Sequence, residues 1–279
     1  MKQQKIFFTG LIAVSVLFIA CNSNNDKKAE ENAEEKGTKF KEENIAYNLD
    51  TVSMNGYVVY DENKEGKRPG VLVIHEWWGM NDYTKMRARE LAKLGYIAMA
   101  IDMYGNGKIA DNPGDAQKMA MPFYQDPQMV KARFDAALNK LKTYSQVDTG
   151  NIAGIGYCFG GGMLLNLARL GEDLNGVVSF HGSLLGTPAV KELVKAKILV
   201  CHGAADSFVS QSEVDQFKKQ MDSIGADYTF KVYEGATHAF TNPDATETGK
   251  KFNLPISYNA AADSASWNDM KEFFGRIFK

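Results

Sequence analysis

The chain has 279 residues, of which 44% are hydrophobic and 24% are charged, and this suffices for one substantial globular core or two small ones. Its 32 basic and 34 acidic residues give a formal net charge of -2, which argues against a protein that neutralises a phosphate backbone. We therefore expect no nucleic-acid partner. The three cysteines, at positions 21, 158 and 201, are too few and too scattered for a disulfide framework, so each needs its own explanation.

The first twenty residues have the pattern of a signal peptide. A positively charged start, M-K-Q-Q-K, precedes an uncharged and mostly apolar stretch from Ile6 to Ala20. As a helix this stretch would rise only about 22 Å, less than the roughly 30 Å hydrocarbon core of a bilayer. The ending F-I-A-C resembles the cleavage signal of bacterial lipoproteins, which implies lipidation of Cys21. We expect an exported protein, lipid-anchored on the periplasmic or cell-surface side of a bacterial membrane; the alternatives are ordinary secretion and an uncleaved anchor.

Residues 21–43 are expected to form a disordered tether. They are rich in Lys, Glu, Asp and Asn and contain very few apolar residues, so they cannot bury enough surface to fold alone. The folded domain is then expected to span residues 44–279, with no further boundary inside it.

Strand and helix patterns alternate along the rest of the chain. Strands are predicted at 52–60, 70–75, 96–102, 152–157, 177–180, 198–202 and 229–233, and helices at 84–94, 129–143, 160–170, 188–196, 210–223 and 266–278. This alternation predicts an α/β fold with a mostly parallel sheet and helices on both faces. Because such sheets bind ligands beyond the carboxyl ends of their strands, functional residues are expected in the loops that follow strands.

Cys158 follows one of these predicted strands, in the sequence G-Y-C-F-G. This is the nucleophile-elbow pattern with Cys in place of the more familiar Ser, and it lies at the strand-to-helix junction where that motif belongs. Gly156 and Gly160 leave room for a tight turn, and the positive end of the following helix would stabilise a thiolate. The alternative is a structural cysteine that merely packs, but the setting favours a nucleophile.

A nucleophile in this fold needs a histidine base and an acid to orient it, in the chain order nucleophile, acid, histidine. His181 and His238 follow Cys158 outside the predicted strands. His238 is preferred, since the only acidic residues between Cys158 and His181 lie at the far end of a helix. Asp206, a short turn after the strand at 198–202, is the expected acid, and Cys201 inside that strand is expected to be buried.

The loop H-E-W-W-G also follows a predicted strand. In an elbow hydrolase this loop donates one backbone N–H of the oxyanion hole, and the residue after the nucleophile donates the other. These residues would be Trp77 and Phe159. The acidic Glu76 needs polar partners or a place in the site, because an unpaired buried charge is costly. No metal is expected, since the loop lacks the second histidine of helical zinc motifs.

Five motifs in order carry a resemblance to a known family: H-E-W-W-G, L-A-K-L-G-Y-I-A-M-A-I-D-M-Y-G, G-Y-C-F-G-G, H-G-A-A-D and Y-E-G-A-T-H-A-F. The chain resembles the dienelactone hydrolase family of α/β hydrolases over residues 57–279. The resemblance implies Cys158 as nucleophile, His238 as base and Asp206 as orienting acid. It implies that Glu76 contacts the resting thiol and moves when substrate enters, and that the enzyme is a monomer without a cofactor.

The chain departs from that family where dienelactone itself would bind. Members that act on it hold the substrate carboxylate with two arginines, one after a D-x-Y segment and one four residues past the catalytic histidine. Neither region contains Arg here; the second position is Asn242, and Lys108 near the first cannot form a two-pronged clamp. We expect an ester, lactone or other activated acyl substrate different from dienelactone, cleaved through a thioester on Cys158.

Two further expectations concern the surroundings of Cys158. Trp78 and Tyr104 are expected to line the substrate pocket, and the segment 241–258 is a candidate roof. The rival from another class is a non-catalytic surface lipoprotein that binds a ligand in this aromatic pocket. A redox thiol is disfavoured because no resolving cysteine is evident.

Overall fold

The computed structural model describes residues 37–278. The predicted signal peptide at 1–20, the lipidation site Cys21 and the tether as far as residue 36 lie outside the described residues. Within the described part, no helix is both long and apolar enough to cross a bilayer.

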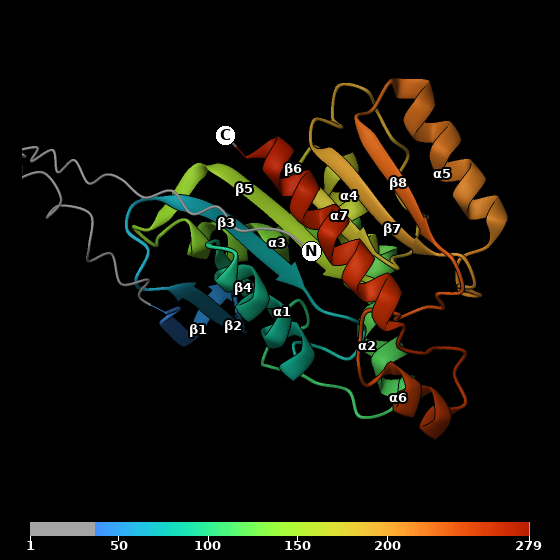
Figure 1. Ribbon diagram of the computed structural model, residues 1–279, viewed down its shortest axis with the longest axis horizontal. Coiled ribbons are helices and arrows are strands. Elements are labelled where there is room, and N and C mark those ends of the chain that lie inside the picture. Colours follow the sequence, from blue (N-terminus) through green and yellow to red (C-terminus); the bar gives the residue numbers. More distant parts are fainter. Residues whose placement is uncertain (1–36, 279) are drawn as a thin grey trace, which may run out of the picture. The chain divides into compact units, whose positions relative to one another are not determined.

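Eight strands form one sheet in the order β1-β2-β4-β3-β5-β6-β7-β8 (Figure 1). The strands are β1 (Phe40–Leu49), β2 (Val52–Asp61), β3 (Arg68–Ile74), β4 (Ile97–Ile101), β5 (Val147–Tyr157), β6 (Gly176–Phe180), β7 (Lys197–Gly203) and β8 (Tyr228–Tyr233). The helices are α1 (Asp82–Lys93), α2 (Pro113–Gln125), α3 (Pro127–Leu141), α4 (Phe159–Arg169), α5 (Gln211–Ile224), α6 (Ala245–Phe252) and α7 (Ala260–Ile277). Only the pairs β1–β2 and β2–β4 are antiparallel, so the predicted mostly parallel sheet is confirmed.

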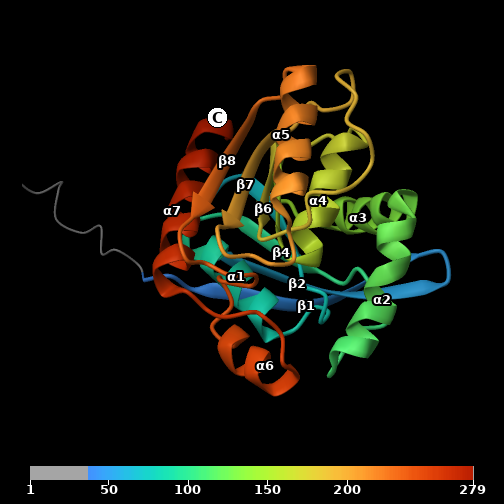
Figure 2. The ribbon, with the colours of Figure 1, turned by 90° about the vertical axis from the view of Figure 1, so that its right-hand side faces the viewer.

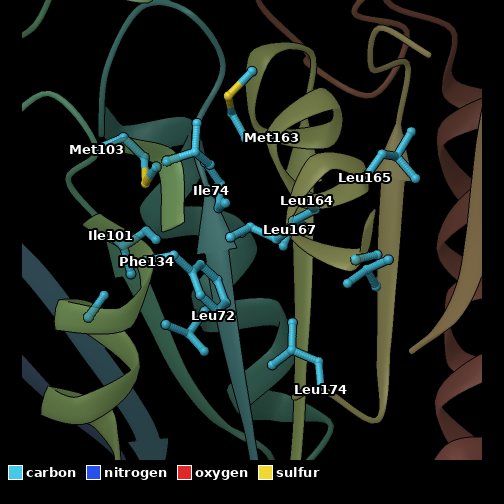
Figure 3. Close-up of a cluster of buried hydrophobic side chains, with 14 of the residues drawn as sticks. Leu72, Ile74, Ile101, Met103, Phe134, Met163, Leu164, Leu165, Leu167 and Leu174 are labelled. Carbon is cyan, nitrogen blue, oxygen red and sulfur yellow. The ribbon is translucent and has the colours of Figure 1, made fainter. Parts of the chain in front are cut away.

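The sheet carries a hydrophobic core on each face. Along β3, Leu72 and Ile74 pack with Phe134 of α3 on one face (Figure 3), and Val71 and Val73 pack on the other with α1 and α7. Figure 2 shows α7 on one side of the sheet and α3, α4 and α5 on the opposite side. Each fully buried aliphatic side chain contributes about 1.5–3 kcal/mol, so the central strands form a rigid base for the loops at their carboxyl ends.

Strand β1 corrects the expected start of the domain. It pairs with β2 along its whole length, from Phe40 opposite Asp61 to Leu49 opposite Val52. The expected tether was therefore too long, because residues 40–43 belong to the sheet. The charged sequence of β1 concealed it: an edge strand gains its stability from backbone pairing and often carries charged side chains that discourage further pairing.

The helices differ from the predictions in three places. The helix predicted at 188–196 was wrong: the segment contains only a turn. Val190 and Leu193 are 44% and 42% exposed there. A helix of this length would therefore have no packed apolar face to stabilise it. Helices α2 and α6 were not predicted. The start of α2 had a signal, since the Asn112 side chain accepts a hydrogen bond from the Asp115 amide and Pro113 takes the first helical position.

Candidate active site

The turn between β5 and α4 holds Cys158 in a strained conformation, with φ 53° and ψ −113°. The residues two positions before and two positions after Cys158 have to be glycines. A Cβ on Gly156 would lie 2.3 Å from the carbonyl of Gly160, and one on Gly160 would lie 2.4 Å from the carbonyl oxygen of Ile74. The Cys158 amide donates to the Phe180 carbonyl at 3.0 Å. The sequence motif thus folds into a sharp turn that leaves a free, partly exposed thiol at the end of the sheet.

His238 and Asp206 meet beside this thiol from the loops after β8 and β7. His238 Nδ1 lies 2.9 Å from Asp206 Oδ2, and the other carboxylate oxygen accepts from the Phe208 amide at 2.9 Å. Burial lowers the pKa of His238, but the charge of Cys158 and hydrogen bonds with Asp206 and Cys158 outweigh it and raise that pKa to about 10. The structure therefore brings together the three side chains that the sequence selected, with an imidazolium favoured next to the sulfur.

A cavity of about 540 Å³ opens over the thiol. Its lining is mostly apolar and comes from seven segments of the chain: Glu76, Trp77, Trp78, Gln117, Ala120, Met121, Tyr124, Cys158, Ser183, Phe208, Val209, His238, Ala239, Leu254 and Ile256. No Lys or Arg belongs to this set. Most of the wall residues, including those of α2, carried no signal in the sequence that linked them to the site.

Tyr104 does not line the cavity, contrary to expectation. It is 7% exposed and packs behind the cavity wall, with its ring 5.5 Å from that of Phe159. Its hydroxyl donates to the carbonyl of Trp77 at 2.8 Å. Tyr104 thus supports the loop that lines the cavity, whereas Trp77 and Trp78 form part of the lining itself.

The two amides expected to form an oxyanion hole are braced by His75. Within residues 37–278, the N–H groups of Trp77 and Phe159 have no protein acceptor, so both remain available as donors. His75 is fully buried; its Nε2 accepts from the Met103 amide at 3.3 Å, so its Nδ1 carries the proton donated to the Glu76 carbonyl. Its ring stacks on that of Phe159 at 5.6 Å. Burial lowers the pKa of His75 to about 4, which keeps it neutral for this task.

Glu76 reaches the cavity with a partner that the sequence did not identify. Glu76 is 3% exposed, and its Oε2 accepts from Asn242 Nδ2 at 2.7 Å. Glu76 and Cys158 line the same cavity, and within residues 37–278 the hydrogen bond of the Glu76 carboxylate goes to Asn242 and not to the thiol. Burial raises the pKa of Glu76 to about 7, although Asn242 and His238 act in the opposite direction.

Glu76 should make the stability of the protein depend on pH. A carboxyl group whose pKa is raised in the folded state contributes stability below its unfolded value of 4.5 and loses it as the pH rises to about 7. We expect Glu76→Gln to leave the free energy of unfolding nearly unchanged at pH 4.5 and to increase it by up to about 3 kcal/mol at pH 8. Denaturant unfolding at both pH values, with Glu234→Gln as an exposed control, measures this. The same difference at both pH values would contradict it.

The segment 241–258, which was a candidate roof, forms one wall of the cavity. Leu254 and Ile256 line it, and the backbone of Ile256 pairs with that of His238 in a short parallel bridge. At the start of the wall, the ring of Phe252 at the end of α6 stacks on Trp78 at 5.9 Å. The wall is thus joined to both the histidine loop and the loop that carries Trp78.

Comparisons with known proteins identify the family to which this fold belongs. Residues 54–278 match the model of the dienelactone hydrolase family. The chain is 30% identical to the protein usf of Aquifex pyrophilus over 235 residues, which cover 82% of this chain and 96% of that protein. It is 30% identical to a putative carboxymethylenebutenolidase of Aquifex aeolicus, with 71% and 86% covered. A dienelactone hydrolase-like promiscuous phosphotriesterase from metagenomic libraries superposes with a TM-score of 0.81 and 32% identity, covering 87% of this chain and 100% of that one.

Proposed function

Since the chain belongs to the dienelactone hydrolase family, a family of α/β-hydrolase enzymes, we propose that it hydrolyses neutral, apolar esters or lactones through a thioester on Cys158. One observation carries the proposal. Cys158, His238 and Asp206 meet at an apolar cavity whose described lining contains no cationic Lys or Arg. Together they provide a nucleophile, a base and an orienting acid, which is the set that acyl transfer needs.

In the proposed reaction, the Cys158 thiolate attacks the acyl carbon and forms a tetrahedral adduct. The negative oxygen of this adduct accepts hydrogen bonds from the amides of Trp77 and Phe159. The C–O bond to the leaving group then breaks, and the imidazolium of His238 gives that oxygen its proton. The thioester remains on the sulfur. Water attacks it while His238 takes the proton of the water, and breakage of the C–S bond releases the acid and restores the thiolate.

The sulfur limits which acyl compounds can react. A thiolate leaves a tetrahedral adduct more readily than most alkoxides or amines, so the adduct returns to substrate unless the competing leaving group is good. Aryl esters, enol lactones and thioesters meet this requirement, and plain amides do not. The proposed substrates are therefore activated acyl compounds.

The lining of the cavity supports a neutral acyl group. A substrate carboxylate would lie among apolar walls near Glu76, with no Lys or Arg of the described lining to pair with it. We expect kcat/KM for p-nitrophenyl butyrate to exceed that for p-nitrophenyl hydrogen succinate at least about tenfold, which is about 1.4 kcal/mol. The two esters share a leaving group and differ chiefly in charge, and their uncatalysed rates are the control.

A mass spectrum of the Cys158 peptide during turnover of the butyrate should show the acyl group on the sulfur. Comparable kcat/KM values for the two esters would contradict the neutral class. Hydrolysis without any acylated Cys158 at rapid-quench times would contradict the thioester route.

We also propose export and lipid anchoring at Cys21. The support is the short apolar stretch and the ending F-I-A-C in the sequence. Metabolic labelling with a fatty acid, comparing the natural chain with Cys21→Ser, tests this part of the proposal; label in both or in neither would contradict it.

A further inference from the structure

We propose that His181 and Thr241 are positioning residues, which hold the turn of Cys158 and the loop of His238 in register through a buried hydrogen-bonded relay. The inference rests on the proposed function only in requiring that the thiol and the imidazole act as a pair. The inference rests on one observation: the His181 side chain hydrogen-bonds both to the backbone of Cys158 and to the hydroxyl of Thr241, which lies on the loop of His238.

His181 directly follows β6 and is 1% exposed, with φ 41°. Its Nδ1 lies 3.1 Å from the Cys158 amide nitrogen and must accept, because the amide can only donate. The ring proton of the neutral form therefore resides on Nε2, which donates to Thr241 Oγ1 at 2.7 Å. The imidazole of His181 thus connects Cys158 and Thr241, which are 83 residues apart in the chain.

Thr241 is itself fixed from behind by α1 and α7. Its hydroxyl lies 2.7 Å from the Tyr83 hydroxyl, and its carbonyl accepts from Arg87 Nη2 at 2.5 Å. Arg87 is 3% exposed and pairs with Glu90 at 2.8 Å and with Asp263 at 2.5 Å. The relay therefore ends on a buried, doubly paired guanidinium, which is a rigid anchor for the loop.

Burial and the charges around His181 keep its ring neutral. Burial, followed by the charges of His238 and Arg87, places the pKa of His181 well below its ordinary value. The His238 ring lies 5.3 Å away and the Tyr157 ring 6.0 Å away. A second positive charge would repel the imidazolium that His238 forms with the thiolate, so a neutral His181 can brace the site throughout the reaction.

The relay also accounts for a strained backbone. The Cys158 amide has two acceptors, the Phe180 carbonyl at 3.0 Å and His181 Nδ1 at 3.1 Å. Residues with positive φ other than glycine persist only when their surroundings hold them, and here both Cys158 and His181 have positive φ. Loss of the second acceptor would release the turn and change the direction of the sulfur relative to His238.

Paired substitutions test the relay in the full-length chain. Thr241→Val and His181→Leu remove its hydrogen bonds, whereas Thr241→Ser keeps the hydroxyl and His181→Gln keeps an acceptor and a donor. Thr84→Val is the control, because among residues 37–278 the hydroxyl of this buried threonine hydrogen-bonds only to the Asn81 side chain. The readouts are carboxamidomethylation of the Cys158 peptide against pH, followed by mass spectrometry, then kcat and KM for a neutral aryl ester, and thermal unfolding.

We expect Thr241→Val and His181→Leu to slow alkylation of Cys158 at pH 7 at least about tenfold and to move its pH profile upward, because the imidazolium no longer stabilises the thiolate. We expect kcat to fall about tenfold or more, with KM changed less than about threefold. Thr241→Ser, His181→Gln and Thr84→Val should keep the natural alkylation profile.

An unchanged profile in Thr241→Val would overturn the relay, and so would equal losses in Thr241→Ser or in the control. A lower unfolding temperature without a change in profile would also overturn it, because it would reduce the role to packing. If His181→Leu fails to fold, the two Thr241 variants decide. Alkylation needs no substrate, so a chain without esterase activity would contradict the proposed function while the relay could still be judged.

Discussion

Replacing Cys158 by alanine is expected to lower kcat/KM for a neutral aryl ester by about 10³-fold or more. The substitution removes the only group at the turn that can form the thioester, and a Cβ without sulfur fits the same backbone. Steady-state hydrolysis with circular dichroism on the same sample measures the effect. Cys201→Ala is the matched control: this thiol is buried, accepts a hydrogen bond from the Tyr233 hydroxyl at 3.4 Å, and should be dispensable for hydrolysis.

Full activity in Cys158→Ala would end the proposed mechanism, because the cavity would then hydrolyse esters without its sulfur. The same result would leave the rival interpretation, a ligand-binding protein on this fold, without support as well, since hydrolysis would persist. Loss of activity in both cysteine variants would instead indicate that the fold depends on each thiol, and circular dichroism distinguishes this outcome.

Replacing Asp206 by asparagine is expected to reduce kcat about 10³–10⁴-fold. The carboxylate accepts the Nδ1 proton of His238 at 2.9 Å, which leaves Nε2 free to act as a base. An amide in its place can present N–H₂ to Nδ1 and so favour the other tautomer, in which Nε2 is already protonated. Measurements of kcat across pH give the loss. The basic limb of the kcat profile should shift to lower pH, because the charge and hydrogen bond of Asp206 no longer raise the pKa of His238.

Asp173→Asn is the control for this substitution, because Asp173 is exposed and lies on the loop between α4 and β6. Activity of Asp206→Asn within tenfold of the natural chain would contradict the role assigned to the carboxylate. The unfolding temperature of the variant should stay close to that of the natural chain, since Asn can still accept from the Phe208 amide as Asp206 Oδ1 does at 2.9 Å.

The places of Cys158, Asp206 and His238 in the fold could be predicted from the sequence because local rules determine them. A thiol between glycines at a strand-to-helix junction has few conformations open to it, and the carboxyl ends of parallel strands meet at one edge. Asp206 and His238 each follow a strand on that edge, and their strands β7 and β8 lie on the same side of β5, which precedes Cys158.

Trp78 was predicted to line the cavity, but most other surroundings of these residues could not be predicted, because they depend on contacts between segments with no shared local pattern. The hydrogen bond between Asn242 and Glu76 joins residues 166 positions apart, and the one between His181 and Thr241 joins residues 60 positions apart. Tyr104 was misplaced for a related reason: an aromatic residue after a strand can face the cavity or support its wall, and only the packing decides which.

The origin of the cavity walls has a consequence for the evolution of this chain. Met121 and Tyr124 come from α2, and Leu254 and Ile256 from the stretch after α6, whereas Cys158, Asp206 and His238 follow strands of the sheet. Point substitutions in these peripheral segments can therefore reshape the cavity while Cys158, Asp206 and His238 keep their places at the strand ends. One fold can in this way carry cavities of different shape around the same three side chains.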